Sequence, residues 1–84
     1  MNKRLELALH WIENEYLSAT KKFGNFHNAH EGYAVLLEEV DELWEGVKLK
    51  QTNTGREAHL VYEAIHVAAM ALRFIMDCCG DNGP

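Results

Sequence analysis

Acidic side chains gather in one short stretch of this 84-residue chain, and their spacing suits the binding of a metal ion. Six of the thirteen acidic residues fall within fifteen positions: Glu31, Glu38, Glu39, Asp41, Glu42 and Glu45. No Lys or Arg lies between Lys22 and Lys48. On a helix, Glu39 and Glu42 would lie about one turn apart on one face, and carboxylate oxygens are the ligands that Mg²⁺ prefers. The stretch predicts a divalent-cation site, with a solvated acidic face as the ordinary alternative.

A second set of polar residues follows one face of an otherwise apolar segment near the C-terminus. Together with Met70, these residues are spaced by four, three, four, three and four positions: His59, Glu63, His66, Arg73 and Asp77. Such spacing puts them on a single line along a helix. If this helix packs against the acidic one, Glu63 and His66 are placed to meet the carboxylates of the latter.

Three helices are expected to carry these residues, over 3–22, 29–50 and 56–79. In each range apolar residues recur at spacings of three and four, which is the helical period, and no strand-like alternation competes. The sequence therefore predicts an all-α fold, with 1–84 as a single domain.

Two short motifs mark where the second and third helices should begin. Asn28 followed three residues later by Glu31 is typical of a helix cap, and Thr54 followed by Glu57 fits the same pattern. We expect Asn28 and Thr54 to accept hydrogen bonds from the first turns of these helices.

The apolar residues predict which side of each helix is buried. The stripe on the first helix consists of Leu5, Ala8, Leu9, Ile12, Tyr16, Ala19 and Phe23. On the second helix it consists of Leu36, Val40, Leu43 and Val47, flanked by Tyr33, Leu37 and Trp44. The third helix is apolar around most of its circumference, which indicates burial on more than one side. Since three helices cannot cover that surface, we expect homo-oligomerisation, as a dimer or tetramer, to complete a helical bundle.

Composition narrows the choice of partner. The formal net charge is -5, so nucleic acid polymers and anionic membranes, which need a basic surface, are not expected as partners. We expect no stretch to reach the roughly 18 apolar residues of a membrane span, so a soluble, cytoplasmic protein is predicted. The two cysteines, Cys78 and Cys79, are adjacent, and a disulfide framework is not expected.

The segments 30–48 and 63–77 resemble the MazG-like members of the all-α nucleoside triphosphate pyrophosphohydrolase superfamily. The pattern of that family is ExxE, a gap, and then ExxD. Glu39 and Glu42 match the first element, and after twenty intervening residues Glu63 matches the first acid of the second. His66 stands where the family has Asp, and imidazole suits Mn²⁺, Zn²⁺ or iron better than Mg²⁺.

The resemblance implies Mg²⁺-dependent hydrolysis of a nucleoside or deoxynucleoside triphosphate to the monophosphate and pyrophosphate, with Mn²⁺ as the alternative ion. The metal ligands that it implies are Glu39, Glu42, Glu63 and His66. Glu38 would act with Glu39 as a catalytic carboxylate, either as a further ligand or as a base that orients water. Arg73 and Lys48 would contact the substrate phosphates, for which an ion pair to Asp77 and a solvated cation are the respective alternatives.

Two other functions remain open from the sequence. Glu63 and His66 also form an ExxH motif, as in di-metal carboxylate proteins of the ferritin type, where a homodimer would supply two copies. A non-catalytic or regulatory oligomer that keeps the superfamily fold without its chemistry is the other alternative.

Overall fold

The computed structural model describes residues 2–80, and all of its regular secondary structure in that range is helical. The helices are α1 (Lys3–Phe23), α2 (Ala29–Lys48) and α3 (Arg56–Cys78). Each predicted helix therefore begins at the expected residue and ends within two residues of the expected position. The all-α prediction is confirmed for the described part of the chain.

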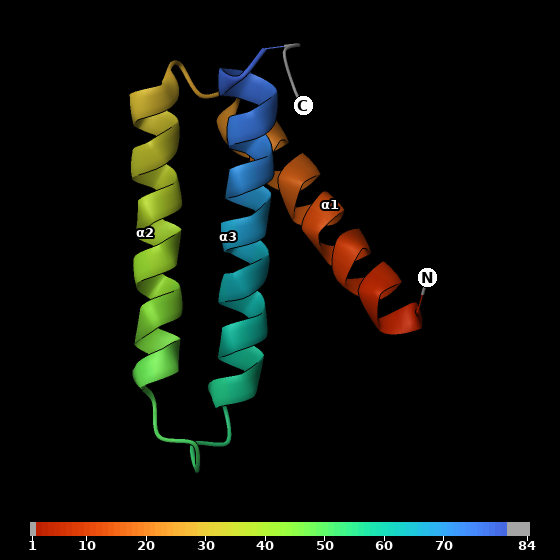
Figure 1. The fold of residues 1–84 in the computed structure, drawn as a ribbon, viewed down its shortest axis with the longest axis vertical. Helices are drawn as coiled ribbons and strands as arrows, with labels where there is room; N and C mark the ends of the chain where they lie inside the picture. Colours follow the sequence, from red (N-terminus) through yellow and green to blue (C-terminus); the bar gives the residue numbers. More distant parts are fainter. Residues whose placement is uncertain (1, 81–84) are drawn as a thin grey trace.

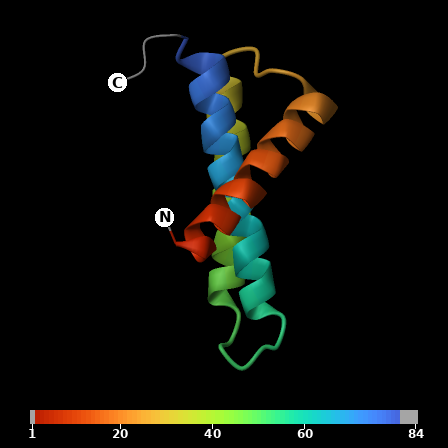
Figure 2. The same ribbon diagram turned by 90° about the vertical axis from the view of Figure 1, so that its right-hand side faces the viewer.

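Helix α3 lies at the centre of the arrangement. It runs antiparallel to α2, forming a hairpin, and α1 crosses α3 obliquely on another side (Figures 1 and 2). The α1 and α2 backbones do not approach each other, so α1 is held to the rest of the molecule through α3. Side chains that converge from all three helices must meet around α3.

The start of α2 follows its sequence signal, whereas the start of α3 does not. The Asn28 side chain accepts a hydrogen bond from the Glu31 N–H at 2.8 Å, as expected of a cap. The prediction that Thr54 caps α3 is wrong, because Gly55 occupies the cap position and makes no side-chain bond. The preceding turn is closed instead by Asn53, whose side chain accepts a hydrogen bond from the Gly55 N–H at 2.9 Å.

Two glycines allow α2 to approach α3 closely. A Cβ atom added at Gly32 would lie 2.9 Å from a ring carbon of Phe74, and one at Gly46 would overlap the ring of His59. Glu39 stands seven positions from each glycine and therefore lies on the same line of the helix. The two close approaches bracket Glu39 and bring it towards α3.

The buried face of α2 differs from the predicted stripe. Leu36 and Leu43 are partly buried, but Val40 and Val47 are 41% and 42% exposed. The face that contacts α3 is centred one residue earlier, which is about 100° around the helix, because the glycines draw that side inwards. The predicted stripe on α1 is likewise only partly correct, since three of its seven residues are exposed: Leu5, Leu9 and Phe23.

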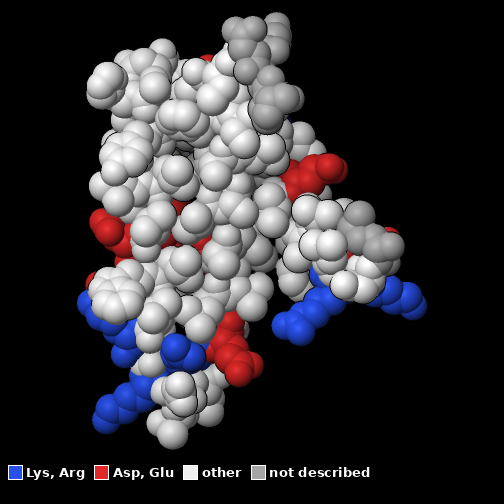
Figure 3. Space-filling view, viewed as in Figure 1, with Lys and Arg blue, Asp and Glu red and all other residues white. Residues whose placement is uncertain are grey.

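On α3 the polar line is the buried side. Glu63 and Arg73 are 5% and 3% exposed, while Val61 and Tyr62 on the apolar sides are exposed. The buried apolar side chains of the described residues are few: Ala19, Phe26, Ala69 and Met70. Sixteen large apolar side chains are exposed, and uncharged atoms cover much of the face that α2 and α3 form in Figure 3.

Helix α3 is long and apolar enough, by length and composition alone, to cross a membrane. This corrects the expectation that no segment reaches that limit. The core helix of a soluble protein passes the same test, so the finding does not decide between the two environments.

Candidate metal and phosphate site

Three of the predicted ligands form a compact cluster at the middle of the α2–α3 interface. Glu39 comes from α2, and Glu63 and His66 come from successive turns of α3. One donor atom from each of these residues lies within 4.8 Å of the others. The cluster offers two carboxylate oxygens and one imidazole nitrogen, a donor set that can hold a divalent ion.

The electrostatics of the cluster favour a cation. The Oε2 atoms of Glu39 and Glu63 are buried and have no hydrogen-bond partner among the described residues. Burial raises the pKa of Glu63, and the neighbouring Glu42 raises it further. Burial also raises the pKa of Glu39, followed by the charge of Glu42. Buried carboxylate oxygens that accept no hydrogen bond are costly in their charged form, and a bound cation would remove that cost.

Glu42 borders this cluster without being enclosed by it. Its charge acts on both Glu39 and Glu63, although its own side chain is exposed. It is therefore close enough to take part in holding an ion from the solvent side.

The His66 ring stands between two carboxylates from different helices. Its Nδ1 lies 3.6 Å from Oε2 of Glu39, and its Nε2 lies 3.4 Å from Oε1 of Glu15 on α1. Glu15 was not among the predicted site residues. A signal was present, because Glu15 lies three residues after Ile12 and four before Ala19, inside the stripe of α1 that turns towards α3.

A pocket of about 560 Å³ opens beside the cluster and is lined by all three helices and the loop after α1. Glu38, Glu39 and His66 line its acidic part. Lys22 and Arg73 also line it and supply positive charge. Acidic and basic groups therefore face a single space.

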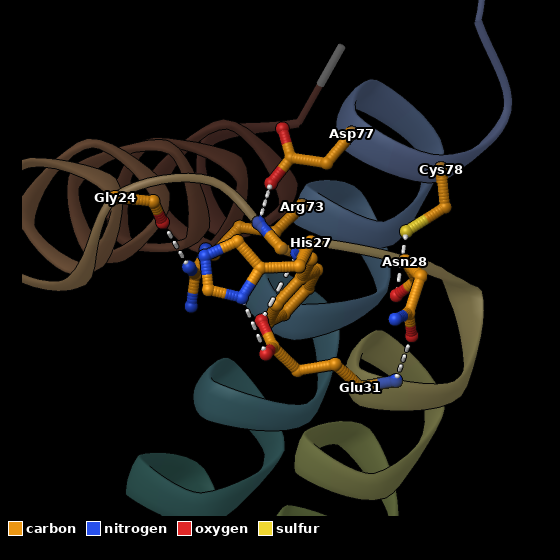
Figure 4. Close-up of polar contacts among 8 residues, drawn as sticks. Gly24, His27, Asn28, Glu31, Arg73, Asp77 and Cys78 are labelled. Atoms are coloured by element: carbon orange, nitrogen blue, oxygen red, sulfur yellow. Dashed lines mark hydrogen bonds and ion pairs between the residues drawn. The ribbon is translucent and has the colours of Figure 1, made fainter.

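Arg73 is a buried cation without a carboxylate partner in the described residues. Its guanidinium lies over the Phe26 ring at 4.2 Å and donates to the backbone oxygen of Gly24 at 2.6 Å (Figure 4). The expected alternative, an ion pair with Asp77, does not form; Asp77 instead accepts a hydrogen bond from the Phe26 N–H at 3.0 Å. A hydrogen bond from the His27 backbone is the main cause that lowers the pKa of Glu31, and the charge of Arg73 contributes less.

The remaining predicted site residues lie as follows. Glu38 is exposed and lines the pocket. Lys48 lies at the end of α2, where its Nζ pairs with Glu45 at 2.9 Å, and it does not line the pocket. Lys22, which was not among the predicted site residues, is the lysine that lines it.

A second, open and mainly apolar pocket of about 660 Å³ lies between α1 and the first half of α3. Trp11 of α1 and Ile65 of α3 line its apolar part. Glu15, Tyr62 and His66 line both pockets, so the apolar and the charged spaces adjoin at the cluster.

Comparison of the chain with protein-family models, with curated proteins and with solved structures finds no match. The site must therefore be interpreted from its own residues.

Proposed function

We propose that the protein is a MazG-like nucleoside triphosphate pyrophosphohydrolase, which cleaves a (deoxy)nucleoside triphosphate to the monophosphate and pyrophosphate with a divalent ion, Mg²⁺ or Mn²⁺. The observation that carries the proposal is the joint lining of one pocket by Glu39 and His66 of the cluster and by Arg73, a buried arginine that forms no ion pair among the described residues. Glu63, the third residue of the cluster, is not part of this lining. A triphosphate chelated to a divalent ion is complementary to such a pocket, because it offers a cation to the carboxylates and oxygen anions to the arginine.

The residues of the cluster fit a divalent ion, as the buried oxygens of Glu39 and Glu63 that accept no hydrogen bond from the described residues indicate. Glu39, Glu63 and His66 would hold it, with Glu42 completing the set from the exposed side. When bound, the ion neutralises the triphosphate and polarises the α-phosphoryl group.

The other polar residues of the pocket bind the substrate and orient water. Arg73 and Lys22 bind phosphate oxygens, and the buried Arg73 does so with little loss of side-chain freedom because Phe26 and Gly24 already fix it. Glu38 orients the attacking water and takes up its proton. The adjoining apolar pocket accommodates the base against Trp11 and Tyr62.

We further propose that the active form is a cytoplasmic homo-oligomer, a dimer or tetramer. The many exposed apolar side chains of the single chain support a second copy as their cover. A membrane is the less favourable cover for α3, because this helix would carry the ionisable side chains of Glu63 and Arg73 at membrane depth, where such groups are costly.

The direct test is to incubate the protein with each nucleoside and deoxynucleoside triphosphate in the presence of Mg²⁺ or Mn²⁺. Monophosphate and pyrophosphate should appear in equal amounts, whereas release of inorganic phosphate alone, or no turnover with any substrate, would refute the proposal. Glu39→Gln should reduce turnover by at least about a hundredfold, since it removes a charged ligand. Asp41→Asn removes the same charge from an exposed position of α2 and should leave turnover unchanged.

One observation favours the di-metal alternative: His66 lies inside the cluster. A di-metal protein would bind two transition ions per site and consume oxygen when loaded with iron. These two measurements separate it from a pyrophosphohydrolase, and an intact oligomer that neither turns over triphosphates nor binds two ions would favour the non-catalytic alternative.

A further inference from the structure

We propose that the cluster of Glu39, Glu63 and His66 selects a first-row transition ion, such as Mn²⁺ or Co²⁺, over Mg²⁺, and that Glu15 of α1 is the positioning residue that orients His66 for it. This inference rests on the metal site of the proposed function but not on its substrate. Of the two ions proposed above, Mg²⁺ and Mn²⁺, the cluster then favours Mn²⁺, and α1 contributes Glu15 to the site.

The choice of ion follows from the donors. Mg²⁺ prefers oxygen ligands alone, whereas imidazole nitrogen suits Mn²⁺, Fe²⁺, Co²⁺ and Zn²⁺. Only one imidazole is present among the three donor residues, but its donor atom lies within 4.8 Å of both carboxylate donors. A site that must accept this nitrogen discriminates against Mg²⁺.

The burial of Glu63 points independently to a cation. Its side chain is 5% exposed, and its Oε2 atom has no hydrogen-bond partner in the described part of the chain. A carboxylate in that position is destabilising unless something positive pairs with it. Among the described residues no Lys or Arg forms an ion pair with Glu63.

The orientation of the ring assigns a separate role to each of its nitrogens. Nδ1 faces Glu39 and hence the cluster, at 3.6 Å, and Nε2 faces Glu15, at 3.4 Å. A neutral imidazole that ligates through Nδ1 carries its proton on Nε2, so Glu15 is placed to accept that N–H. Such outer carboxylates fix the tautomer and the ring orientation of metal-binding histidines.

Glu15 also ties metal binding to the position of α1. Because the backbone of α1 approaches that of α3 and not that of α2, the contact between Glu15 and His66 links this helix to the α2–α3 interface. An ion that fixes His66 should therefore stabilise the attachment of α1, and loss of the Glu15 carboxylate should weaken ion binding although Glu15 is not itself a ligand.

The test uses the whole chain, stripped of metal and without nucleotide. Calorimetric titration with Mn²⁺, Co²⁺ and Mg²⁺ should give one ion per site and tighter binding of the transition ions. Glu15→Gln should weaken Co²⁺ binding about 10- to 100-fold, the usual range for an outer partner. Glu13→Gln, which removes the same charge from an exposed position of α1, is the matched control and should leave Co²⁺ binding unchanged.

A spectroscopic measurement on the unmodified protein keeps the inference testable if a variant unfolds. Long-range ¹H–¹⁵N spectra of the Zn²⁺-loaded protein should show His66 ligated through Nδ1 and protonated at Nε2. Mg²⁺ binding as tight as that of Mn²⁺ and Co²⁺, ligation through Nε2, or equal effects of the two glutamine variants would each overturn the inference. Because no nucleotide is present, a positive result here with no triphosphate turnover would refute the proposed hydrolase and leave the ion site standing.

Discussion

Glu63 combines two properties of the site: it offers a carboxylate to an ion, and it is buried. It belongs to the proposed ion-binding cluster, and it is one of the two buried charged residues in the described chain, the other being Arg73. Its pKa is raised, first by burial and then by Glu42. A raised carboxyl pKa means that the folded protein holds the proton more tightly than the unfolded chain does, so this group lowers stability as the pH rises above 4.5.

Glu63→Gln should therefore stabilise the metal-free protein at neutral pH, by about 0.5–2 kcal/mol, because the amide needs no counter-charge. Urea denaturation in the presence of a chelator measures the free energy of unfolding of both proteins. The difference should vanish at a pH well below 4.5, where Glu63 is protonated in both states. A variant less stable than the original at neutral pH would show that Glu63 already has a favourable partner.

Single residues differ in how far the sequence could predict their place. Glu39, Glu63 and His66 were predicted to converge because their spacing fixes the faces on which they lie, and the structure brings them together. Glu15 and Lys22 were not, because their contribution depends on the angle at which α1 crosses α3, and no local pattern encodes a crossing angle.

At the scale of helices, the regular spacing of Gly32, Glu39 and Gly46 determines how α2 meets α3. Each glycine permits a close approach, and the carboxylate midway between them is thereby held at the interface. The same three positions of α2 therefore determine both the packing of the hairpin and the place of Glu39 in the proposed ion-binding cluster.

Gly46→Ala should destabilise the protein although alanine favours helix formation by about 1 kcal/mol. The added Cβ would overlap the His59 ring, and overpacking of this kind costs about 1–3 kcal/mol. Thermal unfolding of Gly46→Ala, His59→Ala and the double variant forms a cycle that isolates the contact. When His59 is already alanine, adding Gly46→Ala should no longer lower the thermal stability. Purely additive effects of the two substitutions would mean that a neighbour other than His59 causes the loss.

The helices themselves were predictable because their signals are local: periodicity for all three, and the Asn28 cap for α2. The cap of α3 was not, because Asn53 competes with Thr54 by closing the turn one residue earlier. The buried face of α2 was misplaced for a different reason. The position of apolar residues along the sequence cannot show that glycines, which contribute no side chain, lie on the side of α2 that comes closest to α3.

At the scale of the molecule, the single chain leaves much apolar surface uncovered. Ile75 and Met76 on the last turns of α3 are 54% and 58% exposed, and α2 contributes Trp44 and Tyr33 to the same class of exposed residues. Small domains bury too little surface to leave such groups in water without cost. A second copy of the chain is the cover that we propose.

Sedimentation or light scattering at micromolar concentration should accordingly give the mass of a dimer or tetramer. Met76→Glu should shift the protein towards the monomer, because it would place a charge in the apolar contact. Gln51→Glu adds the same charge to the polar turn between α2 and α3 and serves as the control. A monomeric parent protein, or equal effects of both variants, would contradict the oligomer.

The connection between α1 and α2 carries a consequence for the order of folding. The last turns of α3 hold this loop: Arg73 donates to the oxygen of Gly24, Asp77 accepts from the N–H of Phe26, and Cys78 donates to the oxygen of Asn28. These partners lie 49, 51 and 50 positions apart in the chain. The loop can acquire its shape only after α3 has closed onto α2, since distant contacts form late.

In pulsed hydrogen exchange, the Phe26 amide should gain protection after the amides of α2 and α3, and earlier protection would contradict this order. The end of the pocket that contains Arg73 is then the last part of the chain to assemble, and the acidic end exists before it.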